Sequence, residues 1–300
     1  MSHRPELSVV IASVNGLPYP LECLEALEQQ REEVELEVIV ADCTGTATAV
    51  AIRDRFPWVK LLTWPEQRNI PDLRAAGVGA AAGRLVAVTE DHCVPRPGWA
   101  RTLVASQQET GWAAVGGGVE NGAIERPIDW AVYFCEYANL MAPVPYGPAT
   151  AIPGMNVVYD MDQLAEIRHI FTEGIWENVI HDRIRAAGFE IGLDPRIVVD
   201  HRKHFTVAMF LAERYHYSRA FAGNRVAGAG IGTRLRYAAR SVLLPPVLLA
   251  RIVRAVVTKQ RNLRPLARSA PLVILFSVVW AIGEAVGYLF GPGDSLVRIR

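Results

Sequence analysis

RLVAVTEDH, residues 84–92, is the most informative stretch of this 300-residue chain. Its apolar part, residues 85–88, is short and rich in valine, which is typical of a buried strand. The strand is followed by Glu90, Asp91 and His92, side chains that can bind a metal ion or a hydroxyl group. Residues 95–99, PRPGW, must then leave the sheet, because proline cannot donate to a strand ladder. Ligands of open α/β sheets bind at the carboxyl ends of the strands, so we expect chemistry here.

Further apolar runs extend this pattern in both directions. Residues 7–12 and 37–41 are nearly all apolar, and residues 20–30 between them have one apolar face at helical spacing. Strand, helix and strand in this form indicate an α/β fold with a mostly parallel central sheet covered by helices on both faces. We expect strands over residues 7–12, 37–41, 59–63, 85–88, 113–115, 157–159, 191–193 and 197–199, and helices over 20–30, 47–56, 73–82, 102–110, 177–187 and 210–225. Gly83 fits a C-terminal helix cap.

Composition limits the classes of function. The formal net charge is zero, and no basic-aromatic recognition module is found, so nucleic acid is not an expected partner. The four cysteines are far apart and form no C-x-x-C pair, as expected for reduced thiols in a cytosolic protein: Cys23, Cys43, Cys93 and Cys135. The first apolar run has six residues, which is too short for a signal peptide, so we expect the catalytic part in the cytosol.

The motif R-x-x-G-x5-G at residues 74–83, the strand, EDH at 90–92 and P-x-P-G-W at 95–99 together resemble the family 2 glycosyltransferases of the GT-A fold. The resemblance spans roughly residues 7–225. It implies a donor site in which two acids of an Asp-x-Asp motif hold a divalent metal and the ribose of a nucleotide sugar. Here Glu90 and His92 stand at the two Asp positions. Carboxylate and imidazole both bind Mn²⁺, whereas Mg²⁺ prefers oxygen, so the implied cofactor is Mn²⁺ or Mg²⁺.

The resemblance also implies which residues contact the nucleotide sugar. Asp42 would meet the base, although an Asp before Thr-Gly also suits a simple turn. Arg74 would reach the pyrophosphate, or it is a surface arginine, and Ala75 replaces an asparagine common in the family. Arg219 would clamp the diphosphate, or it belongs to a solvated basic face. The predicted donor residues are Ala12, Ser13, Asn15, Asp42, Arg74, Glu90, Asp91 and Arg219.

On the acceptor side, the resemblance implies a Gly-x-Asn segment at Gly154 and Asn156. Glu177 stands where the family has its catalytic Asp, and Trp176 replaces the acid that precedes it. An acid at a helix start is also ordinary complementation of the helix dipole. His201 would complete the metal site with Glu90 and His92, although a single histidine after a strand is often structural.

The C-terminal part has a different character. Residues 242–257 are apolar but carry Arg251 and Arg254 on one helical face, which predicts an interfacial amphipathic helix. Residues 270–290 are almost continuously apolar and long enough to insert into or span a bilayer. The expected organisation is a catalytic domain over residues 1–232 and a membrane-associating helical region over residues 233–300.

These observations predict a membrane-anchored, metal-dependent inverting glycosyltransferase. It would move a sugar from a nucleotide-diphosphate sugar to a lipid-linked or membrane-proximal saccharide acceptor, at the cytoplasmic side of the cell membrane. Two alternatives remain: a polyprenyl phosphate as the acceptor, or a non-catalytic membrane protein that binds nucleotide sugars. Pocket residues that choose the sugar or the base, and the oligomeric state, are not predictable from these patterns.

Overall fold

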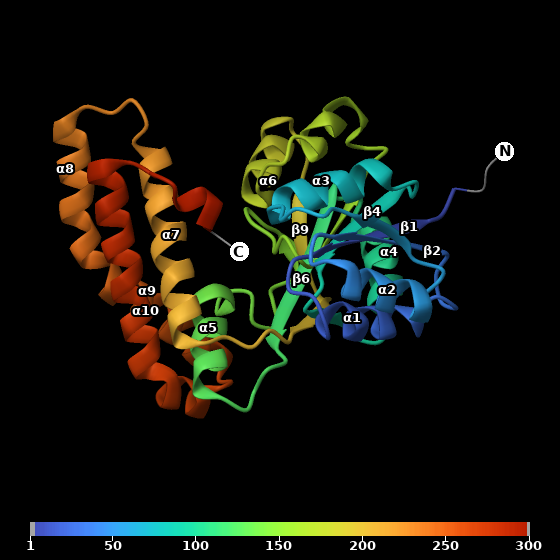
Figure 1. Ribbon diagram of the computed structural model, residues 1–300, viewed down its shortest axis with the longest axis horizontal. Coiled ribbons are helices and arrows are strands. Elements are labelled where there is room, and N and C mark those ends of the chain that lie inside the picture. Colours follow the sequence, from blue (N-terminus) through green and yellow to red (C-terminus); the bar gives the residue numbers. More distant parts are fainter. Residues whose placement is uncertain (1–3, 299–300) are drawn as a thin grey trace. The chain divides into compact units, whose positions relative to one another are not determined.

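The computed structural model describes residues 4–298 and divides into two compact units (Figure 1). The first unit contains residues 1–122 and 140–203, and the second contains residues 123–139 and 204–300. This division differs from the expected boundary at residue 232. The chain enters the second unit twice, because an early aromatic helix belongs with the C-terminal helices.

The first unit is built on one mixed sheet in the order β3-β2-β1-β4-β8-β6-β9-β5, with β7 paired to β9. The strands are β1 (Leu7–Ser13), β2 (Leu36–Asp42), β3 (Lys60–Thr63), β4 (Leu85–Glu90), β5 (Cys93–Pro95), β6 (Ala114–Asn121), β7 (Gly147–Pro148), β8 (Val157–Asp160) and β9 (Ile191–His201). The section β3-β2-β1-β4 is parallel, whereas β8 runs antiparallel to both β4 and β6. The predicted α/β fold class is confirmed, and its sheet is mixed.

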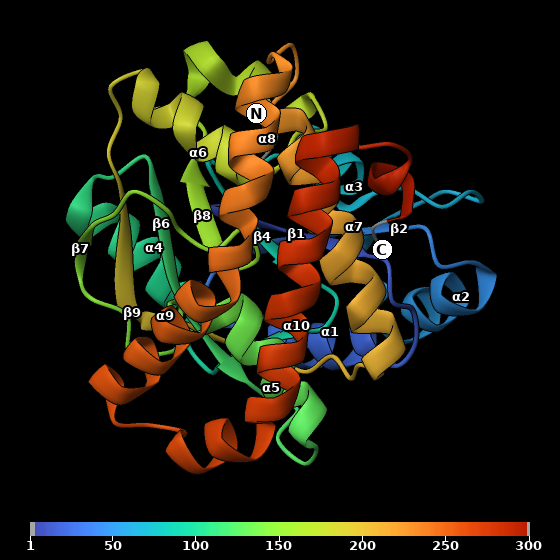
Figure 2. The same ribbon diagram turned by 90° about the vertical axis from the view of Figure 1, so that its left-hand side faces the viewer.

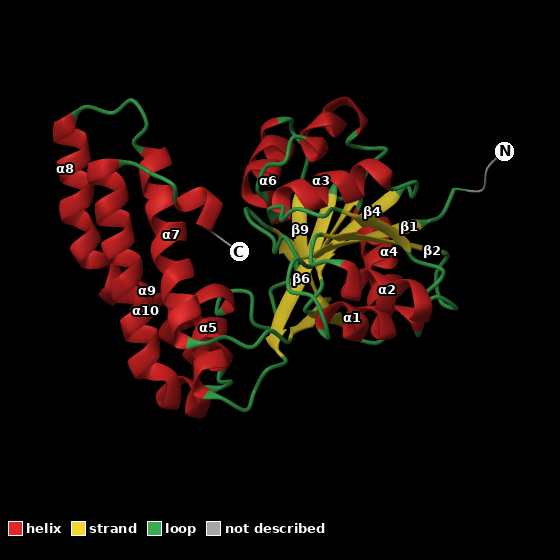
Figure 3. Cartoon of the chain, in the orientation of Figure 1, coloured by secondary structure: helices red, strands yellow, loops and turns green. Residues whose placement is uncertain are grey.

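Helices cover the sheet on both faces, with α3 and α6 on one side and α1 and α2 on the other (Figure 3). The helices of this unit are α1 (Tyr19–Glu28), α2 (Thr46–Arg55), α3 (Ile70–Ala80), α4 (Trp99–Thr110) and α6 (Glu177–Ala186), with a 3-10 helix at Ala165–Thr172. Buried valines and isoleucines of the central strands form much of the core between these layers, among them Val10, Ile39, Val86 and Val157.

Two expectations about local structure are wrong. Gly83 does not cap the preceding helix, which ends at Ala80 and has Ala81 as its C-cap residue. Gly83 instead lies against the first strand, where an added Cβ would come within 2.7 Å of the Ser8 nitrogen. The two short strands expected over residues 191–193 and 197–199 are one continuous strand, β9, which ends at His201.

The second unit is a helical bundle. It contains α5 (Pro127–Tyr137), α7 (Val207–Arg225), α8 (Ile231–Arg240), α9 (Leu244–Lys259) and α10 (Leu263–Phe290), with short 3-10 helices at Ser241–Leu243 and Ser295–Arg298. Figure 2 shows α10 between α7 and α8. The helices approach closely at Gly283, where an added Cβ would lie 2.0 Å from the Ser218 hydroxyl. Phe210 and Phe276 pack edge to face across the same two helices, with ring centroids 4.7 Å apart.

The two C-terminal helices differ in extent from the expectation. The predicted interfacial helix over residues 242–257 is α9, which continues from α8 through a 3-10 turn. The apolar helix predicted over 270–290 is α10, which begins at Leu263 and so includes Arg264 and Arg268. By length and composition, Ile231–Lys259 with 29 residues and Leu263–Phe290 with 28 residues are each able to cross a membrane.

Candidate functional site

The carboxyl ends of β1 and β4 lie side by side, with Ala12 in register with Glu90. Asp91 follows β4 and is fully buried. Its Oδ2 accepts hydrogen bonds from the backbone nitrogens of Val14, at 3.0 Å, and Asn15, at 2.9 Å, and its Oδ1 accepts from Asn15 Nδ2 at 2.7 Å. Burial alone would raise the pKa of Asp91, but these hydrogen bonds and the neighbouring imidazole lower it. The Asp91 carboxylate therefore fixes the loop after β1.

His92 lies at the centre of a cluster of metal-binding groups. Its Nδ1 is 2.9 Å from Asp91 Oδ1, and its Nε2 is 3.3 Å from Glu90 Oε2 and 3.0 Å from His201 Nε2. The sheet brings the second histidine here, because β5 pairs with β9 and places Cys93 opposite His201. The structure thus brings together the three residues that the sequence predicts as metal ligands.

These residues fit a divalent cation. Donor atoms of Glu90, His92 and Cys93 all lie within 4.8 Å of one another. Two nitrogens 3.0 Å apart, as in His92 and His201, can both contact one ion at bond lengths of about 2 Å. Burial, and then the nearby His92, lower the pKa of His201 well below its usual value, which leaves its imidazole neutral as coordination requires.

Cys93 is a neighbour of this site that sequence reasoning missed. Its thiol is buried, and burial raises its pKa well above the usual value, so the thiol is protonated in this structure. A thiol becomes a strong ligand only as the thiolate. Its position directly after His92 was the available signal, but the short strand β5 that turns it toward the site was not predicted.

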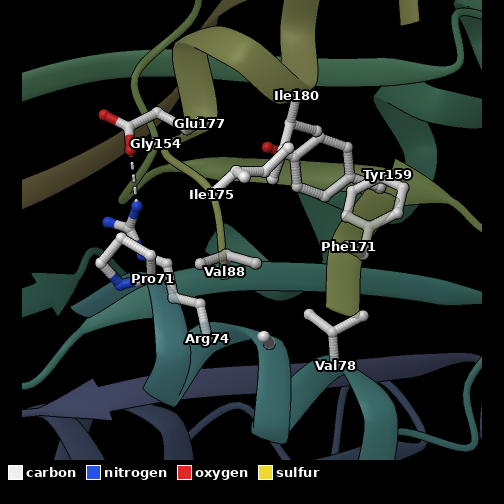
Figure 4. Close-up of a pocket in the computed structure, with 11 residues that line it drawn as sticks. Pro71, Arg74, Val78, Val88, Gly154, Tyr159, Phe171, Ile175, Glu177 and Ile180 are labelled. Carbon is white, nitrogen blue, oxygen red and sulfur yellow. Dashed lines mark hydrogen bonds and ion pairs between the residues drawn. The ribbon is translucent and has the colours of Figure 1, made fainter. Parts of the chain in front are cut away.

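Arg74 joins the two sides of the site. From the second turn of α3, its Nη2 donates to Glu90 Oε1 at 2.7 Å. Its Nη1 donates to Glu177 Oε2 at 2.8 Å (Figure 4). Burial disfavours the charged guanidinium, but the carboxylates of Glu177 and Glu90 outweigh this effect and raise the pKa of Arg74. Its Nε is buried and has no hydrogen-bond partner among the described residues. The arginine is therefore a permanent positive charge between two carboxylates.

Glu177 is the first residue of α6, and Trp176 is its N-cap. The Glu177 side chain is 28% exposed, and its Oε1 accepts no hydrogen bond from the described residues. The carboxylate lies over Gly154, where an added Cβ would come within 2.4 Å of Glu177 Cγ. Glycine at position 154 thus leaves the space in which this side chain lies.

A small cavity of about 20 Å³ adjoins the Arg74–Glu177 pair, and this volume suits one water molecule (Figure 4). On its inner side the Tyr159 hydroxyl lies 2.8 Å from Nε2 of the buried His181. Burial lowers the pKa of His181 to about 4, and the charge of Glu177 opposes this shift. This pair was not predicted from the sequence. The position of His181, one helical turn after Glu177, could have indicated that it lies near the site.

The remaining predicted donor residues in the first unit form a second group. Ser13 is in register with Asp42, and its hydroxyl donates to Asp42 Oδ1 at 2.8 Å. Thr44 donates to the same oxygen at 2.8 Å. Asp42 and Ser13 are buried at the carboxyl ends of β2 and β1, one strand apart.

Two further predicted site residues have hydrogen-bond partners of their own. Asn156 lies in the interior, where its Oδ1 accepts from Trp99 Nε1 at 2.8 Å and its Nδ2 donates to the Gly118 carbonyl at 2.8 Å. Its amide therefore ties the segment that follows Gly154 to Trp99 of α4 and Gly118 of β6. Arg219 belongs to α7 in the second unit, where its Nε donates to the Gly291 carbonyl at 3.3 Å.

Comparison with solved structures defines the class of fold. The mannosyltransferase PcManGT of Pyrobaculum calidifontis, solved in complex with GDP-Man and Mn²⁺, superposes with a TM-score of 0.56 and 18% identity over 94% of this chain and 88% of that chain. The structure of GalNAc-T7 with UDP, GalNAc and Mn²⁺ has a TM-score of 0.49 and 17% identity over 67% of this chain and 44% of that chain. The likeness to the mannosyltransferase shows a GT-A glycosyltransferase fold.

Comparison of sequences gives the family. Residues 8–158, half of the chain, match the family described as glycosyl transferase family 2, so this protein belongs to that family and is a glycosyltransferase. It is 33% identical over 111 residues to the succinoglycan biosynthesis protein ExoO of Rhizobium meliloti. That match covers 36% of this chain and 31% of the relative, so the two share about a third of their lengths. The predicted family, fold and enzyme class are confirmed.

Proposed function

We propose that this glycosyltransferase moves a sugar from a nucleoside-diphosphate sugar to a lipid-linked or membrane-proximal acceptor, with inversion at the anomeric carbon. The observation that carries the proposal is the Arg74 bridge. One buried guanidinium holds both Glu90, a member of the proposed metal-binding cluster, and Glu177, at the start of α6. Donor-side and acceptor-side chemistry would thereby be held in one fixed arrangement.

The donor side would consist of the two groups at the carboxyl ends of β1, β2 and β4. Asp42 and Ser13 would meet the nucleoside, and Ala12 and Asn15 would border it. Asp91 would act by fixing the Asn15 loop, to which it is bonded at 2.9 Å. Arg74 and Arg219 would bind the diphosphate, as only arginine offers bidentate contacts of this kind.

Glu90, His92 and His201 would hold a divalent cation, with Cys93 close enough to contribute. The mixed nitrogen and oxygen donors favour Mn²⁺ over Mg²⁺. What a cation supplies at such a site is neutralisation of charge on the leaving diphosphate. The complexes of the structurally similar mannosyltransferase with GDP-Man and Mn²⁺ support this proposal.

Glu177 would act as the general base. Its Oε1 is available to accept the proton of an acceptor hydroxyl, while Arg74 holds Oε2 and fixes the side chain. Gly154 and Trp176 would border the acceptor, and Asn156 would support them from the interior. General-base catalysis is commonly worth about a hundred- to ten-thousand-fold in rate.

The membrane proposal rests on exposed apolar side chains of the C-terminal helices. On α10, Ile274, Leu275, Val278 and Ile282 are 39–50% exposed and form one stripe. Helix α9 would lie at the interface and α10 would insert or span, with the catalytic unit on the cytoplasmic side of the cell membrane. A relative in succinoglycan biosynthesis supports a membrane-proximal saccharide acceptor.

Slow hydrolysis of the donor tests the proposed function without an identified acceptor. Full-length protein is incubated with a panel of nucleotide sugars with and without Mn²⁺, and release of nucleoside diphosphate is measured. We expect Mn²⁺-dependent release in the wild type and a decrease of at least about a hundredfold in Glu177→Gln, with donor binding retained. Glu166→Gln, an exposed acid of the same unit, serves as the matched control and should remain active.

The outcomes separate the competing functions. No release with any donor, but retained nucleotide binding, would indicate a protein that binds nucleotide sugars without turnover. Near wild-type release of nucleoside diphosphate by Glu177→Gln would contradict its role as the base, because attack by water also requires removal of a proton.

A further inference from the structure

The second unit contains two adjoining hollows that the proposed glycosyl transfer does not use. One of about 100 Å³ lies among α5, α7, α9 and α10, and the other of about 430 Å³ lies along α9. Asn139 and Arg251 line both hollows. Since they share these walls, we treat them as one feature, called the cationic pocket, with Arg214 at its inner end and Arg254 and Lys259 at its outer end.

Arg214 is a buried cation with unused hydrogen-bonding capacity. Its side chain is 8% exposed, its Nη1 donates to Glu136 Oε1 at 3.2 Å, and its guanidinium lies 3.9 Å from the Trp280 ring centroid. Its Nε is buried without a hydrogen-bond partner among the described residues. Burying a charged donor without full pairing is costly, so an anion that reached this arginine would be stabilised.

The outer end of the pocket is also positive. Arg251 and Arg254 are three residues apart on α9, so both lie on one helical face. Neither guanidinium has a described carboxylate within ion-pair distance. Of the described residues that line the pocket, Glu136 is the acidic one, and it already pairs with Arg214. Cys135 adds no charge, because burial raises the pKa of its thiol to about 12.

We propose that the cationic pocket binds the phosphate of an anionic membrane lipid. Arginines present planar, bidentate donors that match phosphate oxygens. A lipid is favoured over free phosphate because exposed apolar side chains adjoin the arginines on the same helix. Val247 is 42% exposed and precedes Arg251 by one turn, and Val257 is 52% exposed beside Arg254. A helix with this mixture suits the boundary between headgroups and acyl chains.

This inference rests on the membrane association proposed above and adds a site with a defined ligand chemistry. Full-length protein is tested by flotation with vesicles of phosphatidylcholine alone and of phosphatidylcholine mixed with phosphatidylglycerol. A basic residue near an anionic surface contributes about 1 kcal/mol, so removing two should weaken binding roughly 30-fold. We therefore expect Arg251→Gln/Arg254→Gln to lose about this much affinity for the anionic vesicles only.

The matched control removes the same charge elsewhere in the unit. Arg236 and Arg240 are exposed on α8, so Arg236→Gln/Arg240→Gln should keep most of the preference for anionic vesicles. Equal losses in both double variants would overturn the pocket and leave only diffuse charge attraction. The single variant Arg254→Gln, at an exposed position, repeats the test if the double variant of α9 does not fold.

Further outcomes separate this inference from the proposals on which it rests. Equal wild-type binding to neutral and anionic vesicles would overturn the lipid-phosphate site while membrane association stands. Failure to bind either vesicle would overturn both, and donor hydrolysis would still report on glycosyl transfer. Stabilisation of detergent-solubilised protein by inorganic phosphate, to the same degree as by a short-chain phosphatidylglycerol, would overturn the choice of a lipid.

Discussion

The buried imidazole of His181 makes folding depend on pH. Its pKa is about 4 in the folded chain against an ordinary value of 6.5, because burial disfavours the charged ring. As pH falls through 6.5, the unfolded chain takes up a proton that the folded chain does not, so stability decreases until pH reaches about 4. Above pH 6.5 the contribution is fully present. The shift corresponds to a loss on the order of 3 kcal/mol across this range.

The measurement is the free energy of unfolding in urea between pH 7 and pH 4, for the wild type and His181→Gln. Glutamine cannot titrate. The free energy of unfolding of the wild type should therefore decrease by about 3 kcal/mol relative to that of His181→Gln as pH falls from 7 to 4. His169→Gln, at a histidine side chain that is 69% exposed, should parallel the wild type. Parallel curves for His181→Gln would show that this imidazole does not stay neutral in the fold.

At the residue scale, the sequence predicts groups that are neighbours along the chain better than groups that meet in space. Glu90 and His92 stand together at a strand end, and the parallel topology brings His201 to them. The bridge from Arg74 to Glu177 joins residues 103 positions apart. It depends on the angle of α6 and on the absence of a side chain at Gly154. No local pattern in the sequence encodes either condition. The sequence therefore predicted that Arg74 binds the donor pyrophosphate, and it did not predict the ion pair with Glu177.

At the element scale, the position of α3 depends on one glycine. An added Cβ at Gly77 would lie 2.3 Å from Cγ1 of Val10, which is fully buried in β1. Gly77→Ala should therefore lower the free energy of unfolding by about 1–3 kcal/mol despite the better helix propensity of alanine. Because α3 carries Arg74, donor hydrolysis should also decrease. Chemical denaturation and the hydrolysis assay measure the two effects.

The same helix provides the matched control. Gly79 is exposed, and an added Cβ would come no nearer than 3.9 Å to another side chain, that of Thr172. Gly79→Ala should raise the free energy of unfolding by roughly 0.5–1 kcal/mol, since alanine loses less backbone entropy in a helix. Equal effects of the two substitutions would mean that α3 does not pack on β1 at the closeness described.

Most helices and strands lie where the apolar pattern of the sequence predicts them, and their ends differ from the predicted ends by a few residues. The exceptions have physical causes. α3 begins earlier than predicted because the Asn69 side chain caps it by accepting from the Asp72 nitrogen at 2.8 Å. β9 continues through Pro195, since pairing with neighbouring strands on either side of that residue holds the backbone extended. Neither the side-chain cap nor the strand pairing can be predicted from the spacing of apolar residues.

At the scale of the whole molecule, the two units are interleaved in sequence, so a simple truncation does not separate them. Ending the chain after residue 232 would remove α10 and expose the buried face of α7, including Phe210 and Ala222. We expect such a protein to aggregate, because α7 would lose its apolar partner. Size-exclusion chromatography of the soluble fraction checks this, with full-length protein in detergent as reference. A monodisperse monomer with native helix content would contradict the helical packing described.

This division could not be predicted from hydropathy, because α5 and α7 are both less apolar than α10, against which they pack. The sequence placed both in the catalytic domain on the basis of their position in the chain. In the structure both helices belong to the second unit, and Phe210 of α7 contacts Phe276 of α10. Long-range partners of an aromatic helix depend on the shape of the finished bundle rather than on local sequence.

The measurement that tests the account most directly is thermal unfolding of the full-length protein with nucleoside diphosphates, with and without Mn²⁺. A ligand that binds only the folded state raises the melting temperature by mass action. We predict that a nucleoside diphosphate stabilises the wild type and His169→Ala only when Mn²⁺ is present, and that His92→Ala loses this effect. Equal Mn²⁺-dependent stabilisation of His92→Ala and the wild type would contradict a cation site built on His92.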